Sequence, residues 1–200
     1  AETMLTIAWT AMLASVLSFK RFSIMLPFGI IVASLAALVS AMGNANPAVT
    51  QLMPVLSSPL LSIHVSLMML SYNVLAIIMV NGICGLVASL RHTSVSDSAS
   101  AKMARMSEAL MYPALFFLGS GIIAGSIWAN VSWGCYWNWD PKETWALITF
   151  LIVSLGVHRT RLPFLRSHRA YHIYTLILSA SVLFTYFGVN YLLGGMHSYA

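Results

Sequence analysis

Residues 109–128 read ALMYPALFFLGSGIIAGSIW, a run without a single Asp, Glu, Lys or Arg. A helix of about 20 apolar residues crosses the ~30 Å hydrocarbon core of a lipid bilayer. Backbone amides inside that core must be paired within the segment, which favours a helix over any open structure. This run therefore predicts a membrane-spanning helix.

Five further apolar stretches lie at about 4–19, 22–42, 60–90, 142–158 and 172–194. The 200 residues are 59% hydrophobic and 8% charged, with a mean hydropathy of +0.83. Soluble domains carry about 25% charged residues. The composition therefore excludes a soluble globular domain and a disordered chain. We predict an all-α polytopic membrane protein with about six transmembrane helices in a single domain over residues 1–200. Because the chain starts without Met, we expect that it is either a fragment or a processed chain.

The basic residues predict which loops face the cytoplasm, because Lys and Arg concentrate on that side of a membrane. All of them except Lys142 fall between spans one and two, three and four, or five and six. The other connections and both termini are therefore expected to face outward. The Ser/Ala-rich segment 93–101 is interpreted as a flexible linker on the cytoplasmic side.

The outward loop between spans four and five is rich in tryptophan. Every Trp of the chain except Trp9 lies between Trp128 and Trp145. An interfacial aromatic belt is one interpretation, but such a belt is spread over many helix ends. Confinement to one loop, interrupted by Gly134, favours an aromatic platform for a planar ligand.

The end of this loop carries a helix-start signal. Asp140 fits the N-cap, Pro141 the first helical position and Glu143 the third, which together predict an acidic capping box. This interpretation explains both carboxylates without a ligand. Lys142 is left over, and its cation would suit an anionic substituent of a ligand.

Two histidines are predicted on the same side as the tryptophans. His64 lies in the first turns of span three, and His197 lies just beyond span six. Each alone is typical of an interfacial hydrogen-bonding residue. Together beside an aromatic platform they indicate an iron porphyrin ligated axially from both faces. Zinc is disfavoured, because it usually takes three or four protein ligands.

The other histidines are expected nearer the cytoplasmic side. His158 closes span five and is either a residue reaching the interface or a second haem ligand. His92 and His168 are interpreted as solvated, and His172 as an imidazole that reaches lipid headgroups.

Three segments carry a resemblance to a known family. Residues 133–149, WGCYWNWDPKETWALIT, resemble the tryptophan-rich "WWD" signature of haem-handling proteins. Tyr136 and the PKETW continuation are similar to the CcsA/ResC type of cytochrome c assembly protein, from the system II pathway. Residues 56–72 and 188–199 resemble the stretches around the external histidines of that family, so the resemblance covers about residues 56–200.

The resemblance implies roles for individual residues. His64 and His197 would be the axial ligands of haem b at an outer site, and His158 would belong to an inner transmembrane haem site. The iron of haem is the one metal implied, and no acid/base catalytic residue is assigned. The implied platform for the outer haem consists of Trp133, Trp137, Trp139 and Asp140.

The implied function is haem transport across the membrane and attachment of haem to apocytochrome c at its Cys-x-x-Cys-His motif. The resemblance implies a CcsA-like subunit of a holocytochrome c synthase, which forms thioether bonds together with a CcsB/ResB-like membrane protein. Its location would be the bacterial inner membrane or the thylakoid, with lipid but no nucleic acid as a further partner. Two alternatives stay open: a b-type haem electron carrier, which the separation of His158 from His172 by Pro163 disfavours, and a solute transporter.

Overall fold

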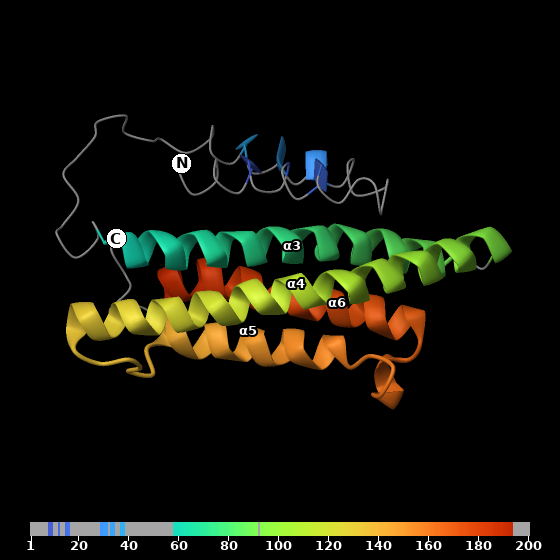
Figure 1. Cartoon of the computed structure of the whole chain (residues 1–200). Helices are drawn as coiled ribbons and strands as arrows, with labels where there is room; N and C mark the ends of the chain where they lie inside the picture. The colour runs from blue at the N-terminus through green and yellow to red at the C-terminus, as the bar shows by residue number, and fades with distance from the viewer. Residues whose placement is uncertain are drawn as a thin grey trace.

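The computed structural model describes residues 58–91 and 93–193, together with residues 8, 9, 12, 15, 16, 29–31, 33, 34, 37 and 38 (Figure 1). The elements are α3 (Pro59–Ser89), α4 (Ser94–Trp133), α5 (Pro141–Val157), a 3₁₀ turn η2 (Pro163–Leu165), α6 (His168–Leu183) and a π-helical continuation η3 (Phe184–Leu193). Each of these elements is helical, which confirms the all-α prediction for the described residues. The predicted spans 4–19 and 22–42 lie largely outside the described residues.

Helices α3 and α4 form a long antiparallel pair. Their contacts run in opposite directions along the chain: Ser71 Oγ donates to the Ala114 carbonyl over 2.9 Å, and Asn81 Nδ2 donates to Ser107 Oγ over 2.5 Å. Polar side chains that bond across helices hold such pairs together where the surroundings are apolar. The predicted span 60–90 agrees with α3 to within one residue at each end.

Segment 93–101, predicted as a flexible linker, is instead the start of α4. Thr93 caps the helix in a reciprocal capping box, with Ser96 N donating to Thr93 Oγ1 and Thr93 N donating to Ser96 Oγ. Ser100 is buried. The prediction was wrong because small residues, read as linker composition, here supply a cap and allow close packing against α6.

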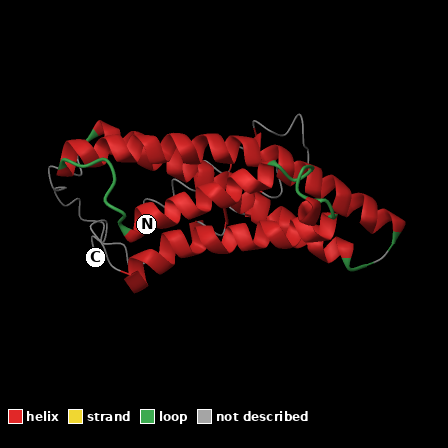
Figure 2. Cartoon of the chain, turned by 90° about the horizontal axis from the view of Figure 1, so that it is seen from below, coloured by secondary structure: helices red, strands yellow, loops and turns green. Residues whose placement is uncertain are grey.

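Helices α5 and α6 complete the bundle formed by residues 58–91 and 93–193, and Figure 2 shows these helices running alongside one another with the loops at the two ends. Helix α5 has 17 residues, at the lower limit for crossing a bilayer. Among the described residues, three helices are long and apolar enough to cross a membrane: α3, α4 and residues His168–Val189. The last of these begins four residues before the predicted span 172–194.

The packed core lies where α3, α4 and α6 meet. Ile77, Met111, Leu118 and Tyr171 are fully or almost fully buried there. Large apolar side chains also cover the outside of the bundle, Phe116 and Ile123 among them. An apolar exterior is what a lipid environment requires of a helix surface, whereas a water-soluble protein rarely carries such extended apolar patches.

The bundle has two chemically different ends. Figure 1 shows the loop between α4 and α5 at the same end as the start of α3 and the end of η3. The connection between α3 and α4 and the η2 loop lie at the opposite end. We call these the tryptophan end and the basic end, after the residues of their loops.

Candidate functional site

His64 lies in the second turn of α3 at the tryptophan end. Its imidazole is half-buried, and its Nδ1 lies 2.7 Å from the backbone carbonyl oxygen of Gly121 in α4. A carbonyl oxygen only accepts hydrogen bonds, so Nδ1 carries a proton, and in the neutral imidazole Nε2 then carries the ring's lone pair. That is the tautomer in which an imidazole binds a metal through Nε2 while its other nitrogen is held by a backbone carbonyl.

Gly125 makes room for this ring. A Cβ atom placed on Gly125 would lie 2.6 Å from His64 Nδ1 and 2.7 Å from Cε1, closer than real Cβ contacts allow. Gly121 and Gly125 are one helical turn apart, so they share one face of α4. We call these two glycines the imidazole seat, because one accepts its hydrogen bond and the other leaves space for the ring.

The tryptophan loop starts where α4 ends. Gly134 adopts a left-handed conformation with φ of 75°, and its N–H bonds the carbonyl of Asn130. Left-handed backbone suits glycine and closes a helix at this position. Just before it, the buried Trp128 ring packs edge-to-face against Trp133, with centroids 4.8 Å apart. This pair anchors the root of the loop in the bundle.

The tip of the loop presents Trp139 outward. This side chain is 70% exposed, and its φ of 56° is left-handed, which is rare for a bulky residue and typical of functional sites. The Trp137 ring lies beside it, with the two ring centroids 5.9 Å apart and the ring planes at 87°. The two rings therefore stand perpendicular and do not form one flat plate, so a planar ligand could lie along only one of them at a time.

The predicted capping box is confirmed. Lys142 N donates to Asp140 Oδ1 over 2.9 Å, and Asp140 N donates to Glu143 Oε2 over 3.3 Å. Glu143 Oε2 also accepts from Asn138 N over 2.8 Å, so this carboxylate ties both residues that flank Trp139. Asp140 is buried and its carboxylate caps α5, so it helps to shape the end of the loop; direct contact between Asp140 and a ligand stays a prediction.

The remaining predicted ligands lie apart from His64. His158 is the exposed C-cap residue of α5 at the basic end, opposite the tryptophan loop. His197 and His92 lie outside the described residues. The structure thus brings His64 and the tryptophans to one end and His158 to the other.

The prediction that His172 reaches lipid headgroups is wrong, because this residue of α6 is fully buried. Its Nε2 lies 3.2 Å from the carbonyl oxygen and 3.1 Å from the hydroxyl of Ser100. The sequence interpretation failed because the predicted span begins near residue 109, whereas α4 begins at Ser94 and its first turns cover this imidazole. His168, predicted as solvated, is exposed but accepts a hydrogen bond at Nδ1 from Arg159 over 2.6 Å.

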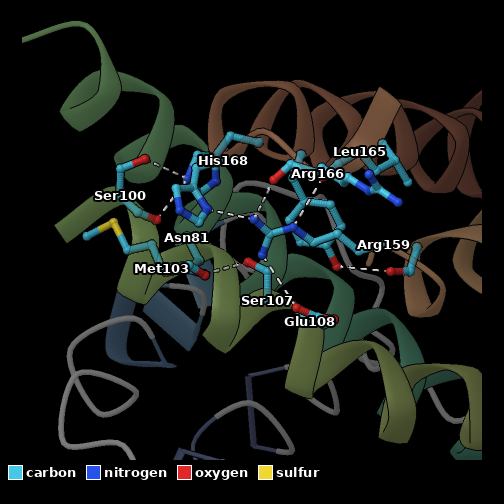
Figure 3. Close-up of polar contacts among 12 residues, drawn as sticks. Asn81, Ser100, Met103, Ser107, Glu108, Arg159, Leu165, Arg166 and His168 are labelled. Carbon is cyan, nitrogen blue, oxygen red and sulfur yellow. Dashed lines mark hydrogen bonds and ion pairs between the residues drawn. The ribbon is translucent and has the colours of Figure 1, made fainter. Parts of the chain in front are cut away.

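Arg159 is the residue that sequence reasoning missed. It was counted among the loop cations at the basic end, yet only 5% of it is exposed. Figure 3 shows its guanidinium group at the centre of a polar cluster that includes Glu108 and His168. Glu108 was the available signal, since it is the one acidic residue between Asp97 and Asp140. An isolated carboxylate at the end of an apolar run calls for a cationic partner.

Known proteins are similar to this chain over nearly its whole length. A sequence model of the family described as "Cytochrome C assembly protein" matches residues 1–197. This chain belongs to that family. Protein NrfI of Wolinella succinogenes is 35% identical over all of this chain. The cytochrome c biogenesis protein CcsA of Chlamydomonas reinhardtii is 32% identical over 99% of it, and that of Guillardia theta is 38% identical over 74%.

The three relatives named above are longer than this chain. The matched region makes up 22% of the Wolinella protein, 59% of the Chlamydomonas protein and 56% of the Guillardia protein. The resemblance to CcsA-type assembly proteins, read from three short segments, is thereby confirmed and extends to residues 1–55. The molecule that the chain handles and the residues that hold it stay predictions.

Proposed function

We propose that this chain holds haem at its tryptophan end and presents it for attachment to apocytochrome c. The observation that carries the proposal is the hydrogen bond from His64 Nδ1 to the Gly121 carbonyl. It selects the metal-binding tautomer and fixes the ring on α4, as outer contacts of ligating histidines commonly do. The absence of a side chain at Gly125 leaves the space that the ring occupies in this position.

His64 and His197 are proposed as the axial ligands of haem b, with the porphyrin against Trp139 and its neighbours Trp133 and Trp137. Such ligation holds the iron from both faces and leaves the vinyl edge open. Each Cys thiol of the apocytochrome motif then adds across one vinyl group: sulfur bonds one vinyl carbon and hydrogen goes to the other. The contribution of the protein is orientation of the reacting groups.

At the basic end we propose that His158 contributes to a second haem site, with its partner ligand supplied by a CcsB/ResB-like membrane protein. In this arrangement the chain crosses a bacterial inner membrane or a thylakoid membrane about six times. The tryptophan end faces outward and the basic end faces the cytoplasm or stroma. The distribution of Lys and Arg supports this orientation, since basic residues concentrate in loops on the inner side.

The alternative of a b-type electron carrier is not favoured by the histidines. Such a carrier would hold haem between imidazoles of paired spans, and His172 is the described candidate to pair with His158. Its Nε2 is engaged by Ser100 inside the α4–α6 contact. A haem there would have to displace this contact and separate the two helices.

The test is an optical spectrum of the full-length protein, purified in detergent together with its CcsB/ResB-like companion. We expect a low-spin bis-imidazole haem signal that decreases in His64→Ala and His197→Ala. Ser66→Ala is the matched control, because Ser66 is exposed on the same helix and bonds only the Ser62 carbonyl. An unchanged spectrum and unchanged cytochrome maturation in the double histidine variant would refute the axial assignment.

A further inference from the structure

Two neighbouring residues at the basic end have opposite surroundings. His158 is exposed, whereas Arg159 is 5% exposed. The chain turns sharply here: the His158 carbonyl accepts from Arg161 N over 2.9 Å and from Leu162 N over 3.2 Å. The position of His158 in this short turn therefore depends on how firmly the neighbouring residues are held.

The Arg159 side chain is held by three other parts of the fold. Its Nε donates to the Leu165 carbonyl, at the end of η2, over 3.2 Å, and its NH2 donates to the carbonyl of the next residue, Arg166, over 3.4 Å. Its NH1 forms an ion pair with Glu108 of α4 over 3.4 Å, and its NH2 donates to His168 of α6. These contacts are drawn in Figure 3.

An aromatic ring completes the attachment. The guanidinium carbon of Arg159 lies 4.5 Å from the centre of the Tyr171 ring, within the range of a cation–π contact. The hydroxyl of Tyr171 in turn donates to the Gly156 carbonyl over 3.2 Å. Gly156 lies two residues before His158 and Arg159 directly after it, so the backbone is held on both sides of His158.

These contacts show what Arg159 does not do. All three guanidinium nitrogens bond acceptors of the chain, so this cation is committed to the protein and not to an anionic ligand or a lipid headgroup. Arg161 on the same turn is exposed and thus suits such a role better. A buried charge with planar, multiple hydrogen bonding is a use to which Arg is suited and Lys is not.

We propose that Arg159 is the positioning residue for His158: its anchorage to α4, η2 and α6 sets where the His158 imidazole points. The proposal rests on the proposed role of His158 as a haem ligand. It adds that the inner site is built by α4 and α6 as much as by α5. Glu108 shares the role through its ion pair with Arg159.

The experiment measures both haem signals in the full-length protein purified with its companion. Arg159→Gln is expected to weaken haem retention at the inner site by roughly ten-fold, the scale on which outer-shell partners of metal ligands act. The outer haem in the same sample reports that the bundle is folded. Thr160→Ala is the matched control, because the Thr160 side chain is uncharged and exposed on the same turn, and it is expected to leave both signals unchanged.

A second background separates positioning from general support. In His158→Gly supplied with free imidazole, the ligand is no longer attached to the turn, so adding Arg159→Gln is expected to cause no further loss. A further loss there would overturn the proposal in favour of a structural role for Arg159. An unchanged inner signal in Arg159→Gln with a lost signal in His158→Ala would overturn it as well.

The failure of the proposed function looks different. If His158→Ala itself keeps the inner signal, His158 is no ligand and the positioning proposal is overturned with it. If Arg159→Gln also loses the outer haem, both haem signals are measured instead in the milder variants Arg159→Lys and Glu108→Gln. Selective loss of the inner signal in them supports positioning, and equal loss of both signals or retention of both contradicts it.

Discussion

The Nδ1 atom of His64 lies 2.7 Å from the carbonyl oxygen of Gly121, one turn of α4 away from the glycine whose missing side chain leaves room for the ring. The relationship joins residues 57 positions apart in the chain. The contact between α3 and α4 thereby holds the His64 imidazole in place and selects one of its tautomers.

Gly125→Ala is expected to displace the His64 ring and to weaken haem retention at the outer site by roughly ten-fold. The new Cβ atom would lie 2.6 Å from Nδ1, which the ring can relieve only by leaving the seat. Haem content measured by absorbance tests this. Gly119→Ala is the control, since its Cβ would lie a tight 3.0 Å from Phe150 but away from His64. Equal losses of haem in both variants would show that Gly125 contributes only general packing and no specific space for His64.

Asp140→Ala is expected to destabilise the protein by about 0.5–2 kcal/mol, because the N-cap of α5 is lost. Asp140→Asn keeps a side-chain oxygen for the Lys142 amide and is expected to retain both stability and haem. Thermal unfolding and haem content of the two variants are compared. Loss of haem in Asp140→Asn at unchanged stability would show that the carboxylate itself contacts the ligand.

Trp139→Ala is expected to lower outer haem content with little effect on the unfolding temperature, because this side chain is 70% exposed. Trp128→Ala is expected to do the reverse, costing about 3–5 kcal/mol of stability as a large buried side chain is lost. Trp139→Phe keeps an aromatic surface and should restore part of the haem. If Trp139→Ala leaves haem and maturation unchanged, the loop is an interfacial belt.

Cys135 provides a test of orientation. In a Cys84→Ser background we expect a membrane-impermeant thiol reagent added outside intact cells to label Cys135, which is half-buried in the tryptophan loop. A cysteine introduced at the exposed Thr160 should react only after the membrane is opened. Labelling of Cys135 solely from the cytoplasmic side would invert the topology and place the haem platform on the wrong face.

Much of the fold was predictable because its signals are local. The run of apolar residues in α3 gave its ends to within one residue, and the Asp-Pro-Lys-Glu pattern predicted the cap of α5 correctly. A helix in lipid pairs its own backbone, so hydropathy and capping residues suffice to place it. The start of α4 was missed because its serines are small and polar, which resembles a linker until a packing partner is known.

The site was predictable only in part, for a related reason. Residue types and motif order selected His64, His158 and the tryptophans, but gave no indication of the angle between the Trp137 and Trp139 rings. The burial of His172 and Arg159 depends on which helix covers them. Their partners Ser100 and Glu108 lie 72 and 51 residues away in the chain. No local pattern encodes a contact at that separation.

By itself, therefore, the sequence determined a helical, membrane-type chain of the cytochrome c assembly family, the ends of α3 and the N-cap of α5, and it singled out candidate haem ligands that stay predictions. Each of these depends on runs and motifs that act over a few residues. Only the tertiary structure decided that α4 reaches back to Ser94, that its glycines seat His64, and that a buried Arg159 anchors the turn at His158. These arise where helices meet, because packing and buried charge are settled by whatever lies across the interface.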